Sequence, residues 1–362
     1  MKNYSYIFYV FVFIFTQKVK AQDPVYSQFY YNRLELNPSF AGNDGGGKFR
    51  LNTFHRNLYR PIKGPFNSSN FSLDYGLCNA NIGIGLIASN ENQGDGFLQT
   101  NKIEGVLSVG SLRLGRNFVG SVGFKLGYIF QNLDWSKYTF SDQYDPIFGN
   151  VRPSVNSTIV SDFSNSPLLG IGFNLSHWNW KKTFAWNAGG SGNNLLSPRL
   201  GYLSPYTLPM RLTLYGAVTF HRNPTINSNS YRIFSRLDYQ DFWGSKLITN
   251  VLLGEYYFNN TLNLGLGLRT TLNKSTINSI NALILSTGLQ PAPTFKIIAS
   301  YEINISGTAN GNTFELGIIW VPEQEICALN GFFNMFRSKR KGGGNVNRLT
   351  CPVFGKDAIK PF

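Results

Sequence analysis

The histidines and cysteines are the residues whose types could support nucleophilic or metal chemistry. The three histidines are His55, His177 and His221, and the three cysteines are Cys78, Cys327 and Cys351. None of the histidines belongs to a recognisable nucleophile motif, and no two have the spacing of metal ligands on one element. The cysteines are remote from them in sequence. We therefore predict no catalytic site and no metal site, and we expect a protein that is not an enzyme.

Two short glycine motifs resemble fragments of a dinucleotide-binding fingerprint. They are Gly83-Ile84-Gly85 and Gly170-Ile171-Gly172. Both lie inside segments whose residues alternate between apolar and polar, so close packing or a bend in a strand explains them better than a phosphate loop. We expect no cofactor.

The clearest structural pattern is the hairpin pattern at residues 246–272. Every second residue from Leu262 to Leu268 is leucine, and the residues between them are small or charged, ending at Arg269. This alternation places all the leucines on one face of a β-strand. Asn259-Asn260 separates the two arms, and asparagine tolerates the positive φ of a tight hairpin turn. The sequence predicts an antiparallel hairpin with one apolar face.

The same alternation recurs along the chain and predicts about fourteen strands. Their expected ranges are 49–57, 66–76, 82–91, 99–113, 117–133, 167–178, 182–191, 209–221, 230–241, 246–258, 261–272, 278–288, 294–305 and 313–321. The connectors alternate between brief turns and longer loops, and the longest lie near 134–166 and 192–208. Tight turns at one end and long loops at the other are typical of outer-membrane barrels. The predicted fold class is all-β, a transmembrane up-and-down antiparallel β-barrel; a soluble β protein is the alternative.

Charged side chains are concentrated on the strand face opposite the leucines. Those expected to face the lumen are Lys125, Arg211, Arg232, Arg236, Arg269, Lys296 and Glu302. Each would cost about 2 to 4 kcal/mol if it faced the middle of a bilayer. This one-sided distribution favours a membrane barrel over a soluble sheet.

The N-terminus has the pattern of a secretory signal peptide. Lys2 precedes an apolar run at residues 4–15, and Val19-Lys20-Ala21 supplies small residues for cleavage after Ala21. A retained membrane anchor is the alternative, but the run is shorter than the roughly 20 residues that a spanning helix needs. Cleavage would remove Lys2, Lys18 and Lys20 and no acidic residue, so the net charge would fall from +14 to +11, which still favours contact with anionic lipid headgroups or an acidic partner. The chain has no nucleic-acid-binding motif.

Residues 22–47 have neither helical nor strand periodicity. An even number of strands places both ends of the barrel on the periplasmic side. The apolar groups of this segment must be buried in the lumen as a plug, against a partner, or by local packing under the barrel. The residues that we single out are Asp23, Pro24, Tyr26, Ser27, Gln28, Phe29, Tyr30, Asn37, Pro38, Phe40 and Gly42.

The C-terminal tail, residues 322–362, is basic and glycine-rich. Its plainest interpretation is a solvated periplasmic end, and contact with an acidic partner or anionic headgroups is the sharper one. Cys327 and Cys351 form a possible disulfide within it. The expected division of the chain is 1–21 signal peptide, 22–48 periplasmic or plug-forming segment, 49–321 barrel and 322–362 tail.

Several motifs resemble the PorP/SprF family of type IX secretion system membrane proteins. The opening QDPxxSQFY…LNPSFAG at residues 22–42 carries most of the resemblance. Further matches are Arg50-Leu51-Asn52, His55-Arg56-Asn57, the stretch Asn70-Phe71-Ser72-Leu73-Asp74-Tyr75, and Cys351-Pro352-Val353-Phe354. The resemblance covers most of the chain after the signal peptide and is weakest over residues 134–166 and in the glycine-rich part of the tail before Cys351.

The resemblance implies a non-enzymatic barrel in the cell outer membrane. Such a protein would support the export, surface retention or gliding movement of cargo proteins such as adhesins. Its expected partners are the C-terminal domain of a cargo protein and periplasmic secretion or peptidoglycan-binding components. A solute channel is the alternative, because a barrel of fourteen strands has a lumen wider than its own side chains fill.

Overall fold

The computed structural model describes most of the chain between residues 25 and 322. The described ranges are 25–43, 47–58, 66–77, 81–93, 98–113, 117–134, 143–145, 147, 149–150, 163–179, 183–202, 206–221, 229–242, 245–273, 276–305 and 311–322. The signal peptide, Asp23, Pro24, Cys78, Cys327, Cys351 and the tail from residue 323 onward lie outside the described residues. The predictions made for them stay predictions.

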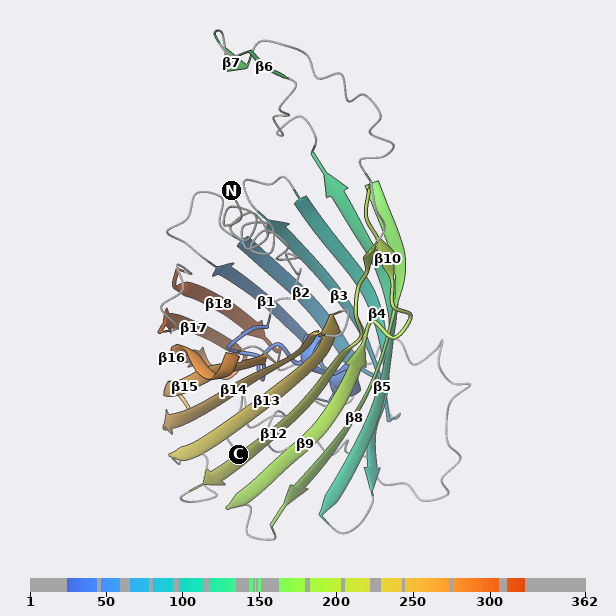
Figure 1. The fold of residues 1–362 in the computed structure, drawn as a ribbon. Helices are drawn as coiled ribbons and strands as arrows, with labels where there is room; N and C mark the ends of the chain where they lie inside the picture. Colours follow the sequence, from blue (N-terminus) through green and yellow to red (C-terminus); the bar gives the residue numbers. More distant parts are fainter. Residues whose placement is uncertain are drawn as a thin grey trace, which may run out of the picture.

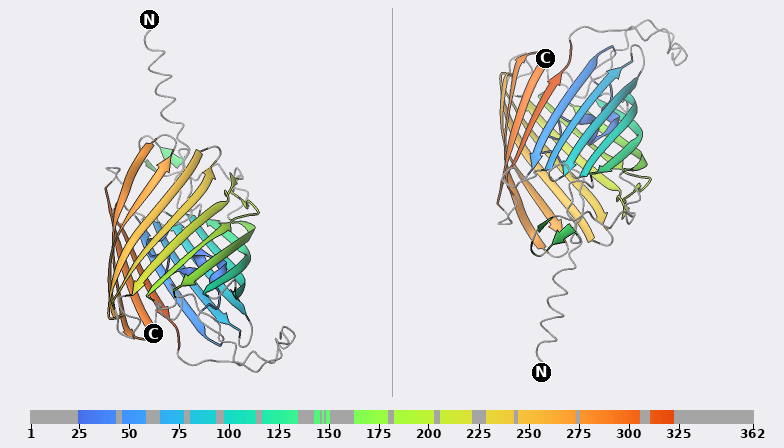
Figure 2. Two further views of the ribbon diagram at one scale, coloured as in Figure 1. Left: turned by 90° about the horizontal axis from the view of Figure 1, so that it is seen from below. Right: turned by 90° about the horizontal axis from the view of Figure 1, so that it is seen from above.

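Fourteen antiparallel strands form a closed barrel (Figure 1). They are β1 (Phe49–Leu58), β2 (Phe66–Gly76), β3 (Ile82–Gln93), β4 (Leu98–Arg113), β5 (Phe118–Leu133), β8 (Phe163–Trp178), β9 (Phe184–Asn193), β12 (Arg211–His221), β13 (Ser230–Phe242), β14 (Ser245–Phe258), β15 (Leu262–Asn273), β16 (Thr276–Ala292), β17 (Phe295–Asn304) and β18 (Thr313–Trp320). Each strand pairs with its neighbours in sequence, and β18 pairs with β1 to close the wall. The predicted fold class is confirmed, and the strands of the wall are seen from two further directions in Figure 2.

Alternation along the strands separates the two faces of the wall. On β15, the side chains of Leu264 and Leu266 are 50% and 65% exposed, whereas the side chain of their neighbour Asn263, which points to the other face, is buried. The β14–β15 turn is the expected one, because Asn259 and Asn260 have φ of 46° and 56°. Two strands extend further than their alternation predicts: β8 begins at Phe163 and β16 spans Thr276–Ala292.

The connectors define two ends of the barrel. The turn end carries the connectors β2–β3, β4–β5, β8–β9, β12–β13, β14–β15 and β16–β17, and the loop end carries the others. Two loop-end connectors contain small two-stranded sheets, β6 (Tyr144–Asp145) with β7 (Gly149–Asn150) and β10 (Arg199–Leu200) with β11 (Tyr206–Thr207). The alternation of connector length does not hold throughout. At the loop end, β13 and β14 are joined by residues 243–244 alone. A two-residue connection between antiparallel strands is common and can occur at either end of a barrel.

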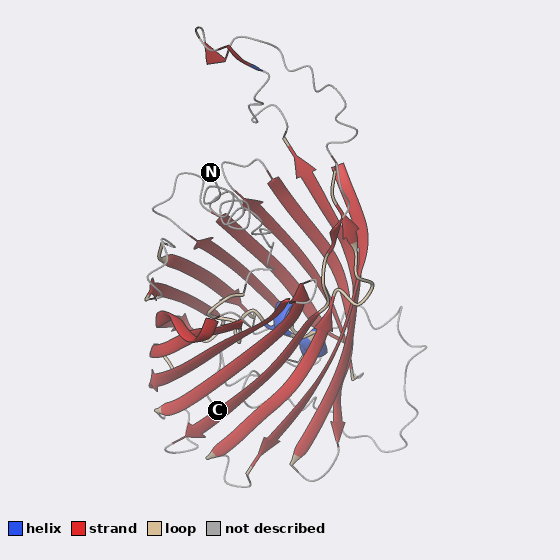
Figure 3. Cartoon of the chain, in the orientation of Figure 1, coloured by secondary structure: helices blue, strands red, loops and turns tan. Residues whose placement is uncertain are grey.

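The segment before β1 lies inside the barrel. It contains α2 (Arg33–Leu36) and the 3-10 helix η1 (Pro38–Phe40), drawn in blue within the wall in Figure 3. Asn37 separates the two helices, and its Oδ1 accepts a hydrogen bond from the Ser39 N–H at 2.9 Å, which caps η1. Among the described residues, no helix is long and apolar enough to cross a membrane.

Candidate functional site

Residues 25–43, which we call the lumen segment, form the most enclosed part of the described chain. All of its residues are buried except Val25 and Glu35, which are half-buried. It contacts the wall on two sides, β1 and β13–β18 on one and β3–β9 on the other. The site is therefore built from the segment outward.

The wall binds the first residues of the segment through their backbone. The Glu315 carboxylate on β18 accepts hydrogen bonds from the N–H groups of Ser27 at 2.9 Å and Gln28 at 3.1 Å. Arg56 and Arg269 donate to the carbonyl of Val25 at 2.6 and 2.8 Å. Arg56 Nε also lies 3.2 Å from Glu315 Oε1, so the buried carboxylate has a cationic partner. Charge-assisted bonds of this kind are stronger than neutral ones.

Two tyrosines of the segment meet a second buried carboxylate, that of Glu255 on β14. It accepts hydrogen bonds from the hydroxyls of Tyr30, Tyr257 and Ser286. Lys296 Nζ lies 2.6 Å from the Tyr31 hydroxyl, which is 2.6 Å from that of Tyr257. Burial, together with the Glu255 charge, raises the pKa of both Tyr30 and Tyr31, so their hydroxyls stay protonated and donate.

Glu35 on α2 is the acidic group that the segment itself brings into the lumen. Arg211 donates to it at 2.6 Å, and Arg236 Nη1 lies 3.6 Å from its second oxygen. Burial opposes its ionisation, but the charges of Arg211, Arg236 and Lys125 outweigh burial and lower its pKa to about 2. Glu35 is therefore ionised at neutral pH and neutralises part of the basic wall.

The second half of the segment lies against a row of glycines, which we call the glycine face: Gly83, Gly85, Gly110, Gly123 and Gly172. A Cβ atom on Gly123 would lie within 3.0 Å of the backbone of Pro38 and Ser39. One on Gly83 would meet the Ala41 carbonyl equally closely. The segment can approach this part of the wall because side chains are absent from it.

Further polar contacts hold the last residues. Ser191 and Ser108 donate to the carbonyls of Leu36 and Ala41 at 2.7 and 2.6 Å. Asp74 on β2 accepts from the Gly42 N–H at 2.7 Å. Past the segment, the Gly47 N–H donates to the carbonyl of Gly76 at 2.6 Å, where the chain joins the wall.

Apolar residues fill the space between the segment and part of the wall. Tyr26, Phe29 and Tyr30 pack in one buried cluster with inward-facing wall residues. Those wall residues include Phe54, Phe234, Val251, Leu253, Ile284, Ile298 and Ile319. The Tyr30 ring stacks on Phe234 with centroids 3.8 Å apart. A water-filled channel has a polar interior, whereas this lumen contains a hydrophobic core.

A small polar cavity lies beside this core, on the side of β3–β5. Its volume is about 30 Å³, and Glu35, Glu104, Lys125 and Arg211 are among the residues that line it. Lys125 Nζ lies 3.0 Å from Glu104. The cavity has room for only one or two water molecules and is far smaller than a solute pathway.

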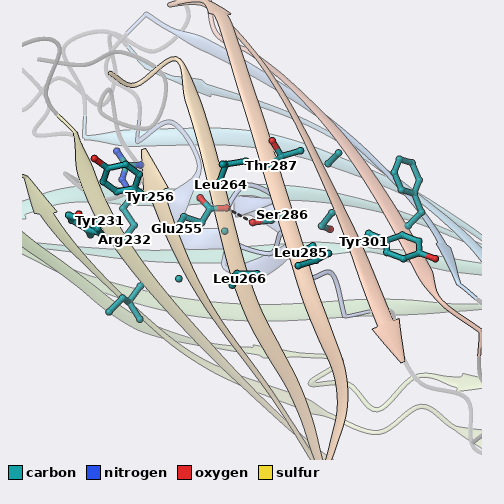
Figure 4. A pocket seen from close by; sticks show the side chains of 16 residues that line it. Tyr231, Arg232, Glu255, Tyr256, Leu264, Leu266, Leu285, Ser286, Thr287 and Tyr301 are labelled. Carbon is teal, nitrogen blue, oxygen red and sulfur yellow. Dashed lines mark hydrogen bonds between the residues drawn. The ribbon is translucent and has the colours of Figure 1, made fainter. Parts of the chain in front are cut away.

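A larger groove of about 900 Å³ lies on the outer wall across β13–β18 (Figure 4). Exposed apolar side chains such as Leu266 and Tyr301 line it, while the Ser286–Glu255 hydrogen bond belongs to the buried face. Gly254 and Ala299 have little or no side chain, so the outer surface of the wall is hollowed there. The groove belongs to the apolar outer surface, and the polar contacts to the lumen segment lie on the other face of the wall.

Most of the residues singled out from sequence meet in this site. Tyr26, Ser27, Gln28, Phe29, Tyr30, Asn37, Pro38, Phe40 and Gly42 all lie in the lumen segment. The inner face of the wall carries the seven charged residues that we expected there. Arg269 and Glu302 lie 2.6 Å apart, and the others are buried: Lys125, Arg211, Arg232, Arg236 and Lys296. Sequence reasoning did not single out Tyr31, Glu35 or Glu255, and it named Asp74 only within a family motif. Of the glycine face it singled out Gly83, Gly85 and Gly172, for close packing or a bend in a strand, but not Gly110 or Gly123. Inward apolar residues such as Phe234 between Arg232 and Arg236 were an available signal that something apolar occupies the lumen.

Comparison with known families identifies the chain. Residues 18–320 match the family model described as type IX secretion system membrane protein PorP/SprF. The chain belongs to the PorP/SprF family. The match includes the lumen segment and all fourteen wall strands, and the family is one of secretion-system membrane components.

Solved structures similar to this PorP/SprF-family chain include three channel or transporter barrels. The CymD monoaromatic hydrocarbon channel is 10% identical, with a TM-score of 0.45 over 85% of this chain and 96% of its own. A TodX deltaS2S3 mutant monoaromatic hydrocarbon channel is 12% identical, with a TM-score of 0.44 over 80% and 92%. The Ralstonia pickettii toluene transporter TbuX is 10% identical, with a TM-score of 0.44 over 80% and 92%. A search of curated proteins finds no match.

Proposed function

We propose that this PorP/SprF-family protein is a closed, non-enzymatic barrel of the outer membrane, exported by a cleavable signal peptide. It supports the export or surface attachment of cargo proteins such as adhesins by the type IX secretion and gliding machinery. The observation that carries the proposal is the lumen segment, which occupies the interior with a hydrophobic core and buried ion pairs. A barrel filled in this way acts through its surfaces rather than as a pore.

The available surfaces are the two ends of the barrel and its outer wall. At the loop end the connectors 134–162 and 194–210 are the longest, and binding residues concentrate on loops held by a rigid scaffold. We assign the cargo C-terminal domain to this end. Periplasmic secretion or peptidoglycan-binding components belong at the turn end.

The test is co-purification from crosslinked cells. A tagged copy of the full chain should bring down a cargo C-terminal domain together with periplasmic machinery, and an unrelated tagged outer-membrane barrel should not. Recovery of the chain as a clean monomer would contradict the proposal.

The alternative function, a solute channel, requires the lumen segment to leave the barrel. Liposome swelling measures it directly: vesicles containing the intact chain should swell no faster in sugar solutions than empty vesicles. Rapid swelling with the intact chain would favour the channel.

A further inference from the structure

The start of the lumen segment lies near the loop end of the barrel. The carbonyl of Val25 is bound by Arg56 and Arg269. Arg56 lies two residues before the loop end of β1, and Arg269 lies in the loop-end half of β15. Glu302, paired with Arg269, and Glu315, which binds Ser27, also lie near the loop-end termini of their strands.

The rest of the segment reaches the turn end twice, at Tyr31 and again at Ala41; between them Glu35 and Leu36 contact Arg211 and Ser191, near the loop-end termini of β12 and β9. Tyr31 contacts Tyr257 and Lys296, each one residue from the turn-end terminus of its strand. Ala41 lies against Gly83, the second residue of β3 from the turn end, and the Gly47 N–H donates to Gly76, the last residue of β2. The chain therefore enters the lumen near the loop end and leaves it at the turn end, where β1 begins.

We propose that the mature N-terminus lies at the loop end, opposite the end where the segment joins the wall. Cleavage after Ala21 would leave three residues before Val25, and three extended residues span about 10 Å at most. A ten-residue strand such as β1 is about 33 Å long. Three residues are too few to return the terminus to the turn end. The even strand number fixes the place of Phe49 at the turn end, but it does not fix the place of Val25.

This topology rests on the proposed function for its orientation, because it equates the loop end with the cell surface. It gives the protein an N-terminus presented beside the loop-end connectors, within reach of whatever binds there. It also gives the lumen segment a direction. Because Gly47 is tied at the turn end, a partner that empties the lumen must draw the free N-terminus through it toward that end.

The experiment compares one epitope tag at three positions in otherwise full chains. The positions are between Asp23 and Pro24, after Asn156 in the β5–β8 connector, and after Thr225 in the β12–β13 connector. Antibody binding is measured on intact and on permeabilised cells, and heat-modifiable migration in gels confirms a folded barrel. The N-terminal tag should behave like the Asn156 tag and be detected on intact cells. The Thr225 tag should need permeabilisation.

If the N-terminal tag were detected only after permeabilisation, as the Thr225 tag is expected to be, the inference would be overturned. Exposure of the Thr225 tag instead of the Asn156 tag would overturn the proposed orientation, and the N-terminal tag would still be judged by which of the two it follows. A smaller change provides a second measurement if the tag weakens folding. Asp23→Cys, in a chain whose three cysteines are replaced by serine, should react with an impermeant maleimide on intact cells as Asn156→Cys does. Reaction only after permeabilisation, like Thr225→Cys, would overturn the inference.

Discussion

Two sides of the same wall hold the lumen segment by different means. On the side of β1 and β14–β18, Glu315 and Glu255 bind backbone N–H groups and tyrosine hydroxyls with directional, charged hydrogen bonds. On the side of β3–β8, the glycine face admits the backbone of Pro38, Ser39 and Ala41 because side chains are missing. The first side depends on charge and the second on volume. Substitutions that separate charge from volume therefore test whether both sides are needed.

The largest effect is expected at Glu315. Glu315→Ala removes the acceptor of the Ser27 and Gln28 N–H groups and a partner of Arg56. Breaking a buried ion pair at one partner costs about 3 to 5 kcal/mol, so the segment should become sensitive to protease in detergent. Leu316→Ala, on the exposed face of the same strand, is the matched control. Equal protease resistance in the two variants would show that the charged side is dispensable.

The glycine face should respond to added volume alone. Gly123→Ala places a methyl group against the backbone of Pro38 and Ser39, and overpacking costs about 1 to 3 kcal/mol. Gly105→Ala on β4 is the control, because its Cβ would lie 3.8 Å from the nearest atom. Brief current steps through planar bilayers should appear with the first variant and not with the second. Identical current traces from the two variants would show that the strand shifts at position 123 to accommodate the methyl group.

A smaller effect is expected from the Tyr30 hydroxyl. Tyr30→Phe keeps the ring on Phe234 but removes one donor to Glu255, which still accepts from Tyr257 and Ser286. The loss should be about 1 kcal/mol, measured as a modest increase in protease cleavage of the segment. Tyr231→Phe on the exposed face is expected to change nothing. Cleavage as fast as in Glu315→Ala would contradict this ranking.

The contribution of Glu35 should depend on pH only in acid. The pKa of Glu35 is lowered from 4.5 to about 2, so its ionisation stabilises the bound segment above pH 4.5. That contribution is lost as the pH falls from about 4.5 to about 2. The part of the protease protection that Glu35 provides, measured as the difference from Glu35→Gln, should therefore be constant from pH 6 to 8 and decline below pH 4.5. Glu35→Gln should flatten the acid decline, and an unchanged decline would assign it to other carboxylates.

Sequence reasoning predicted the wall better than its contents. Alternation such as that of Leu264 and Leu266 depends on local spacing, so strand number and inward charges such as Arg236 could be read directly. The contact of Ser27 with Glu315 joins residues 288 positions apart, and no local pattern encodes such a pairing. Glu255 was missed because Val251 and Leu253 make the inner face of β14 apolar. Gly123 was ambiguous because a strand glycine suits a bend as well as a close approach.

The central claim is that the chain's own N-terminal segment closes the lumen. It is tested most directly by recording single-channel currents from the purified intact chain and from the chain lacking residues 22–47, reconstituted in the same planar bilayer. The account predicts no steady current from the intact chain and steady, salt-dependent conductance after the deletion. Steady conductance from the intact chain would contradict it.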